Sequence, residues 1–396
     1  MSVAVLAQTP CSADVKVMGQ GDLDAIKHCK KFTGNVMIDD VHVPQLELSG
    51  VEEISGDLVI QGSTDLKAFS APQLKTVKGE LKVTNHTILE KVDLPALMEA
   101  KGLTLAILPA LEKIQFPSGL TKIDDMRIED TRAPGIDGFH PESMNSFTLT
   151  NNNYMKHFDF SSVKELKGSL YVIANGHALE FQATNLASLQ NGTFRNLAHL
   201  DVPALSRIGS DISFHQNEFT SLNMDNLELI GGTLTIANND KLTDTSFKNL
   251  AKIGGALSIG NNTQLKTIDG FPKLGEVDGT IDMAGSFESY KLPVLQDVRG
   301  GMRLQTSSSQ FPCSEIEKKM KGDNVVKGTV WSCASSLQES QMTPTIGQNA
   351  GIPDKIGGSS RSGQSTGNTP NLSNAGPVLD SWLALMIGLT FISLSL

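Results

Sequence analysis

Four cysteines are the residues best placed for chemistry in this 396-residue chain, because they form two pairs at the two ends of a repetitive region. Cys11 and Cys29 precede that region, and Cys313 and Cys333 follow it. An even count fits disulfides made in an oxidising compartment, and four cysteines allow three connectivities. We favour Cys11–Cys29 and Cys313–Cys333, each closing a cap. Zinc is the rival, but these spacings lack the short Cys-x-x-Cys clips that zinc favours.

Acidic and histidine residues raise the alternative of a polysaccharide-cleaving enzyme. Asp124-Asp125 and Gly176-His177 superficially resemble polygalacturonase motifs, but they lie 52 residues apart, and the partner motifs are absent. A glycosidase needs two carboxylates about 5–10 Å apart, and we find no acids at matching positions of adjacent repeats. The eight histidines show no metal-ligand spacing, and we expect His177 and His215 in turns or on the surface. The sequence therefore predicts no enzyme and no catalytic, cofactor-binding or metal-binding residue.

The C-terminus has the layout of a GPI-attachment signal. Leu383–Leu396 is apolar and uncharged, and its 14 residues are too few for a membrane-spanning helix of about 20. Small residues and a short spacer precede it, which makes Asn374 the expected anchor residue and residues 377–396 a segment that is removed. At the other end, we interpret residues 1–10 as the remainder of a truncated signal peptide.

Residues 335–376 are rich in Ser, Thr, Gly and Pro, which predicts a disordered, O-glycosylated stalk. Four Asn-x-Ser/Thr sequons, at Asn85, Asn191, Asn261 and Asn371, are expected glycosylation sites in a secreted chain.

The composition narrows the class of partner. The net charge of −10 argues against nucleic acid, whose phosphates require a basic face. Aromatic residues make up only 5% of the chain, which argues against a groove that stacks sugar rings strongly.

The elements that position these residues come from a repeat of about 22 residues. Its frame, Pro/polar-x-Leu-x-x-Ile-x-Gly-x-Leu-x-Ile, is clearest from Pro72 and Pro293 and also starts at Ser49, Ser161, Pro203, Asp225, Lys248 and Pro272. The two apolar residues after the glycine alternate with polar ones, which predicts a strand with one inward face. Such repeats must stack to bury their apolar faces, so the fold predicted is a β-solenoid of about 13 coils.

Asparagines follow the strands, at positions 85, 151, 175, 217, 238 and 261, and predict a stacked turn ladder like that of leucine-rich repeats. The frame slips by one residue at Gly102 and stays loose to about Ser146, and Arg132–Gly138 resembles an inserted loop. Because loops carry function more often than regular elements, this region is where we expect a partner site.

The paired terminal cysteines, the repeated coils, the Ser-rich stalk and the GPI-type tail together resemble the fungal GPI-anchored cell-wall organisation proteins, which include sporulation-specific members. The folded part is similar to receptor L domains, which implies a right-handed parallel β-helix. With the cysteine pairs, the loosened frame and the composition of the C-terminal region, we divide the chain into an N-terminal cap (11–33), two L-domain-like solenoid halves (34–150 and 151–312), a C-terminal cap (313–334), the stalk (335–376) and the removed tail (377–396).

The resemblance further implies a non-enzymatic glycoprotein that supports cell-wall organisation and integrity, anchored in the outer leaflet of the plasma membrane or linked to the wall. Its expected partners are cell-wall glucan or wall proteins. The alternatives are a receptor-like ligand-binding module and a wall-polysaccharide enzyme.

Overall fold

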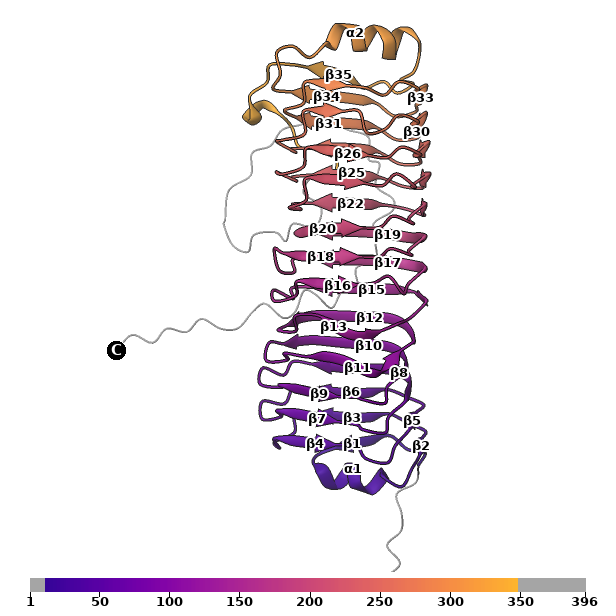
Figure 1. Ribbon diagram of the computed structural model, residues 1–396, viewed down its shortest axis with the longest axis vertical. Helices are drawn as coiled ribbons and strands as arrows, with labels where there is room; N and C mark the ends of the chain where they lie inside the picture. The colour runs from indigo at the N-terminus through magenta and orange to yellow at the C-terminus, as the bar shows by residue number, and fades with distance from the viewer. Residues whose placement is uncertain (1–10, 348–396) are drawn as a thin grey trace, which may run out of the picture. The chain divides into compact units, whose positions relative to one another are not determined.

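The computed structural model describes residues 11–347, which form a parallel β-solenoid of about 13 coils with a repeat of about 22 residues (Figure 1). The apolar pairs of the repeat, such as Leu58 with Ile60 and Leu81 with Val83, are fully buried. These residues form inward-facing strand positions because successive side chains in a strand point to opposite faces. The predicted solenoid is therefore confirmed.

Each coil has a main face, whose strands stack in parallel from one end to the other, with register shifts between β8 and β10 and between β17 and β19. These strands are β1 (Val15–Val17), β3 (Val36–Asp39), β6 (Leu58–Gln61), β8 (Thr76–Thr84), β10 (Glu99–Leu108), β12 (Lys122–Thr131), β15 (Ser146–Thr150), β17 (Glu165–Ile173), β19 (Ser188–Arg195), β22 (Ile212–His215), β25 (Leu234–Ala237), β28 (Leu257–Gly260), β31 (Ile281–Gly285), β34 (Met302–Thr306) and β35 (Trp331–Ala334).

Two further sets of short strands complete the coils. One set belongs to the same sheet: β2 (Lys31–Phe32), β5 (Glu53–Ile54), β14 (Ser143–Met144), β21 (Arg207–Ile208), β24 (Leu229–Ile230), β27 (Lys252–Ile253), β30 (Glu276–Val277) and β33 (Asp297–Val298). The other set forms small separate sheets: β4 (Gln45–Glu47), β7 (Ala68–Ser70) and β9 (Lys91–Asp93); β11 (Ile114–Leu120) and β13 (Ile136–Phe139); β16 (His157–Asp159), β18 (Leu179–Gln182) and β20 (Leu197–Asp201); β23 (Ser221–Asn223) and β26 (Asp244–Ser246); β29 (Thr267–Ile268) and β32 (Ser289–Tyr290).

The core is a continuous column of aliphatic side chains with phenylalanines stacked along it. Phe147 and Phe158 lie parallel with ring centroids 5.2 Å apart, and Phe194 stacks on Phe214 at 5.5 Å. Most of the phenylalanine side chains in residues 11–347 are buried in the core, so few aromatic rings are left on the surface to stack against a ligand.

Short helices close both ends. Helix α1 (Gln20–Ile26) buries Leu23 and Ile26 on the first coil, and helix α2 (Cys313–Glu317) with the π-helical turn η1 (Lys318–Gly322) covers the last. Such caps are what an open stack of coils requires, because its terminal coils would otherwise expose their apolar interior.

The turn after each main-face strand holds a left-handed residue followed by a buried one. Asn85, Asn151, Asn238 and Asn261 have φ values of +61°, +58°, +59° and +53°. The buried rungs are mostly their successors, Asn152, Asn239 and Asn262, together with Asn175 and Asn217. The ladder was thus predicted correctly in kind, but four of its six positions are wrong by one residue.

Residues 342–347, which we call the strap, cross the outward side of the main face after the 3₁₀ turn η2 (Glu339–Gln341). Arg303 Nη2 donates to the Pro344 carbonyl at 2.9 Å, Ile346 N donates to Asp282 Oδ2 at 3.0 Å, and Ser258 Oγ donates to the Ile346 carbonyl at 2.5 Å. All four residues of β25 and of β28 are buried. The strap therefore packs on the solenoid, although the composition of residues 335–376 predicted a stalk; residues 348–376 lie outside the described residues.

The predicted inserted loop at Arg132–Gly138 is wrong, because residues 136–139 form β13, which pairs with β11 in the regular course of a coil. The main sheet continues past residue 150 through the pairing of β15 with β17, and the division into two halves stays a prediction. Within residues 11–347, no helix is both long and apolar enough to cross a membrane.

Candidate functional site

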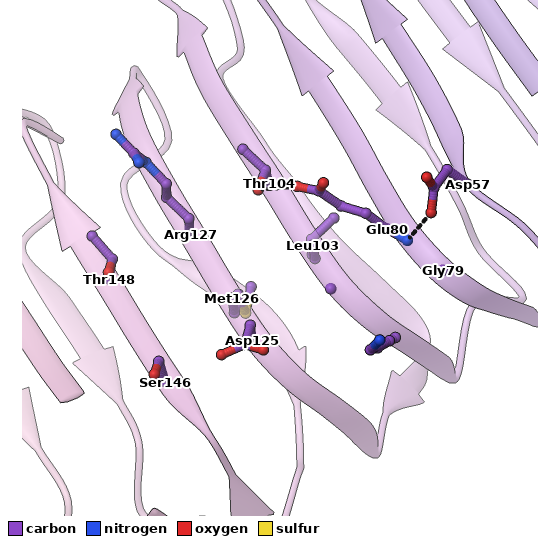
Figure 2. A pocket seen from close by; sticks show the side chains of 12 residues that line it. Asp57, Gly79, Glu80, Leu103, Thr104, Asp125, Met126, Arg127, Ser146 and Thr148 are labelled. Atoms are coloured by element: carbon purple, nitrogen blue, oxygen red, sulfur yellow. Dashed lines mark hydrogen bonds between the residues drawn. The ribbon is translucent and has the colours of Figure 1, made fainter. Parts of the chain in front are cut away.

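A cleft of about 370 Å³ opens on the outward side of the main face, over β8, β10 and β12 (Figure 2). These three strands have 9 or 10 residues each, and the repeat frame slips within β10, at Gly102, and stays loose through β12. The expectation of a partner site between Gly102 and Ser146 thus coincides with a cleft, although the loop singled out there does not line it.

Gly102 forms the middle of the cleft. In register it lies between Glu80 of β8 and Asp125 of β12, so two carboxylate-bearing residues flank a position without a side chain. A register shift between Ala100 and Gly102 places it there. Two strand spacings separate the flanking residues, or about 9–10 Å between their backbones.

Polar side chains line both sides of this gap. Thr104 Oγ1 donates to Glu80 Oε1 at 2.8 Å, and Asp57 Oδ1 accepts the backbone N–H of Glu80 at 2.8 Å. On the other side, Asn145 Nδ2 donates to Asp125 Oδ1 at 2.7 Å. Figure 2 shows Glu80 and Thr104 directed toward one another, with Asp125 across the gap.

Hydroxyls and cations complete the lining. Ser146 and Thr148 come from β15, and Lys101 and Arg127 supply positive charge. Arg127 Nε also donates to Glu129 Oε2 at 2.8 Å, which orients the guanidinium along the strand. The cleft can therefore donate and accept several hydrogen bonds at once.

The acids of the cleft overturn one result of the sequence reasoning, which found no acids at matching positions of adjacent coils. Asp57 and Glu80 both directly follow the frame glycine, and the register of β6 and β8 makes them neighbours. That signal was present in the sequence. The alignment of Asp125 was not, because it depends on the slip at Gly102.

The four cysteines form the favoured pairs, with Cα–Cα distances of 5.6 Å in both Cys11–Cys29 and Cys313–Cys333. His28 Nε2 lies 3.6 Å from both Cys11 Sγ and Cys29 Sγ, the one cluster of metal-ligand type among residues 11–347. Bonded sulfurs are not thiolates, and the thiolate is the form that binds metal, so the arrangement fits a cap and not a zinc site.

The sequons differ in exposure. Asn85 and Asn261 are exposed turn residues, so neither is the buried rung that would have excluded a glycan. Asn191 is half-buried, and its Oδ1 accepts the backbone N–H of Asp211 at 3.3 Å. Asn371 and the predicted anchor residue Asn374 lie outside the described residues. Glycosylation at these sites stays a prediction.

Two histidines were expected in turns or on the surface. His177 lies exposed in a turn, as expected. The prediction is wrong for His215, which ends strand β22 with 1% of its surface exposed. Burial, with a contribution from the charge of Arg195, lowers the pKa of His215 to about 4, so the ring is neutral at pH 7.

The curated relatives of this chain are fungal proteins, several of them named as cell-surface or cell-wall proteins. It is 28% identical to Sporulation-specific protein 2 of Saccharomyces cerevisiae, over 79% of this chain and 62% of that protein. It is 29% identical to a cell surface GPI-anchored protein of Arthroderma benhamiae, over 90% of each chain. With the cell wall protein ecm33 of Schizosaccharomyces pombe it shares 29% identity, over 84% of this chain and 79% of that one.

No family model and no solved structure matches the chain. The chain spans less than two thirds of Sporulation-specific protein 2, but three quarters or more of the other relatives named here. By this similarity over most of its length, the chain is a homologue of the fungal cell-wall and GPI-anchored cell-surface proteins, a group that includes sporulation-specific members.

Proposed function

We propose that this protein is a GPI-anchored glycoprotein of the fungal cell surface that supports the organisation and integrity of the cell wall without catalysing a reaction. The observation that carries the proposal is the 90% coverage of both chains in the match to a cell surface GPI-anchored protein. The terminal disulfides add support, because they suit an oxidising, extracellular setting.

The physical properties of the solenoid suit a display role. Its coils stack into one column with a continuous core, so it is a stiff body that presents polar faces to its surroundings. Its exposed Asn85 and Asn261 sequons would carry glycans on that body. Cell-wall glucan or wall proteins are the partners we propose for its surface.

Release from intact cells tests the anchor. Phosphatidylinositol-specific phospholipase should release a membrane-anchored form, and glucanase should release a wall-linked form. Release by neither enzyme would refute the anchor. The role is tested in a strain that lacks the protein, which should become sensitive to wall-binding dyes and recover when the intact gene returns.

The enzyme alternative has one observation in its favour, the carboxylates of Glu80 and Asp125 on either side of the cleft. Both side chains are exposed, whereas the general acid of a glycosidase such as lysozyme is held in an apolar pocket. We therefore expect neither the wild-type protein nor a variant with Asp124→Asn and Asp125→Asn to release sugars from a wall polysaccharide. Product release from β-glucan, chitin or pectin by the wild-type protein, lost in this variant, would establish the enzyme instead.

A further inference from the structure

We propose that the cleft at Gly102 is a binding site for a neutral, hydroxyl-rich ligand, of the chemical class of an uncharged oligosaccharide. This inference rests on the proposed function in one respect: the location at the cell surface is what would bring the protein into contact with such a ligand. The cleft itself is argued from packing and charge.

Packing does not require the glycine at position 102. Elsewhere in the sheet the frame glycines are enforced by close approach: a Cβ on Gly79 would lie 2.7 Å from the carbonyl of Gly56, and one on Gly255 would lie 2.6 Å from the Gly232 carbonyl carbon. A Cβ on Gly102 would meet nothing closer than Glu80 Cγ at 3.5 Å, an ordinary contact. Its φ also lies outside the left-handed region.

Glycine inside a strand weakens that strand, because it costs backbone entropy and packs no side chain. Position 102 bears this cost with no steric reason, and the result is an open cleft between Glu80 and Asp125. A site that must admit a ligand accounts for the missing side chain.

The charges of the lining select the class of ligand. Because Asp57, Glu80 and Asp125 lie in the same lining as Lys101 and Arg127, an ion of either sign is repelled by part of the lining and gains little net attraction from the rest. A neutral ligand with many hydroxyls meets neither penalty. Its hydroxyls can donate to the carboxylates and accept from the guanidinium, and charged partners make the stronger hydrogen bonds.

The same sheet face already holds a neutral polar chain, the strap. Arg303 occupies the strand position that corresponds to Arg127, directly after a buried methionine, and donates to a strap carbonyl. Asp282 accepts a strap N–H, and Ser258 donates to a strap carbonyl. Carboxylate, guanidinium and hydroxyl groups on this face can therefore bind an uncharged chain of alternating donors and acceptors.

An oligosaccharide fits the open cleft better than a peptide does. The apolar residues that line it, Leu103 and Met126, are 1% and 2% exposed and point into the core, so peptide side chains would find no apolar pocket. No aromatic side chain lines it either. Because little apolar area is buried, we expect weak binding per site, with a Kd on the order of 1 mM.

The test is ligand-observed NMR on the full secreted chain with five probes at millimolar concentration. Three are neutral hexasaccharides, of β-linked glucose, of mannose and of N-acetylglucosamine; one is an oligogalacturonate; and one is a synthetic peptide with the strap sequence. We expect at least one neutral hexasaccharide to bind and the anionic sugar and the peptide not to bind. No binding by any neutral sugar at 10 mM, or preferred binding of the anion or the peptide, would overturn the proposal.

Gly102→Gln is the decisive variant, because the new side chain has room at its Cβ and then fills the cleft. We expect its thermal stability to be equal or higher and its affinity to fall by about tenfold or more, the equivalent of about 1.4 kcal/mol. Thr280→Gln is the matched control: it precedes buried Ile281 as Gly102 precedes Leu103, far from the cleft, and should bind like the wild type. Should the first variant fold poorly, Arg127→Gln provides a second reading with the same expected loss.

Equal sugar binding by both glutamine variants and the wild type would also refute the site. The binding assay uses purified protein, so its outcome is independent of anchor release and of dye resistance in cells. Sugar binding without any wall phenotype would support the site and refute the proposed function. A wall phenotype without sugar binding would support the proposed function and refute the site.

Discussion

Replacing Asn239 with alanine should destabilise the solenoid strongly, because this side chain is a central rung of the buried ladder. Its Oδ1 accepts the backbone N–H of Asn217 at 2.9 Å and the Asn217 side-chain amide at 3.0 Å. Its Nδ2 donates to the Phe214 carbonyl at 3.0 Å and to Asn262 Oδ1 at 3.0 Å. Asn239 is fully buried, so water cannot replace these partners.

The magnitude follows from the groups left unsatisfied. Alanine orphans the Asn217 N–H and removes a donor from the Phe214 carbonyl, whereas the Asn217 amide keeps its bond to the Phe194 carbonyl. Each buried group left without a partner costs about 1–3 kcal/mol, and the lost packing adds to this. We therefore expect a loss of about 3–5 kcal/mol, among the largest effects of single substitutions.

Urea unfolding followed by circular dichroism measures the loss, and hydrogen exchange at the Asn217 amide locates it. Asp240→Ala, at the exposed neighbouring residue, is the control and should stay within about 0.5 kcal/mol of the wild type. If Asn239→Ala unfolds at the same urea concentration as the control, with the Asn217 amide still protected, the ladder does not hold these turns.

Three other perturbations have defined outcomes. His215 has a pKa of about 4 in the folded protein and near 6.5 in the unfolded chain, so the unfolded chain binds the proton first and stability should fall as pH drops from about 6.5 to 4. The urea midpoint of His215→Gln should depend less on pH than that of the wild type. An equal dependence of the two midpoints on pH would contradict this. Serine at both cysteines of the C-terminal disulfide should cost about 3 kcal/mol in thermal or urea unfolding, since the bond closes a loop of 20 residues, and an undiminished stability would show that α2 caps the coil without it. Arg303→Ala leaves the buried Asp282 carboxylate unpaired and should cost about 3–5 kcal/mol, with faster proteolysis of the strap; equal cleavage rates would show that the strap is held by other contacts.

The coils could be predicted from the sequence because each inward position carries its own signal. Leu234 and Ile236, or Leu257 and Ile259, alternate with polar residues, and only an inward strand face needs this pattern at a fixed period. The frame is weak between its starts at Pro72 and Ser161 and between those at Ser161 and Pro203. At about 22 residues a coil these lengths predict four and two coils, and the structure has four steps from β8 to β17 and two from β17 to β22.

Features that depend on contacts with another coil or with a distant segment could not be predicted from the sequence. In Asn238-Asn239 and Asn261-Asn262 either asparagine could take the left-handed turn, and only stacking decides which becomes the rung. The strap looks like part of a flexible stalk by composition, since its partners Ser258 and Asp282 lie 88 and 64 residues earlier in the chain. Local sequence carries no sign of such distant contacts.

The strap and the cleft both lie where outward-facing residues of the main face are small and leave space above the sheet. Toward the C-terminal end the outward positions are small, such as Ala237, Gly260 and Ala284, and the protein's own chain packs in the neighbouring space. At β10 the outward position is Gly102, and no described segment of the chain fills the space. In both places the sheet lacks large outward side chains and so loses packing contacts. The strap supplies such contacts at the C-terminal end, and a bound ligand would supply them at Gly102. Filling that cleft with glutamine should therefore leave the free protein as stable or more stable and weaken binding about tenfold or more, a combination that a purely structural glycine would not produce.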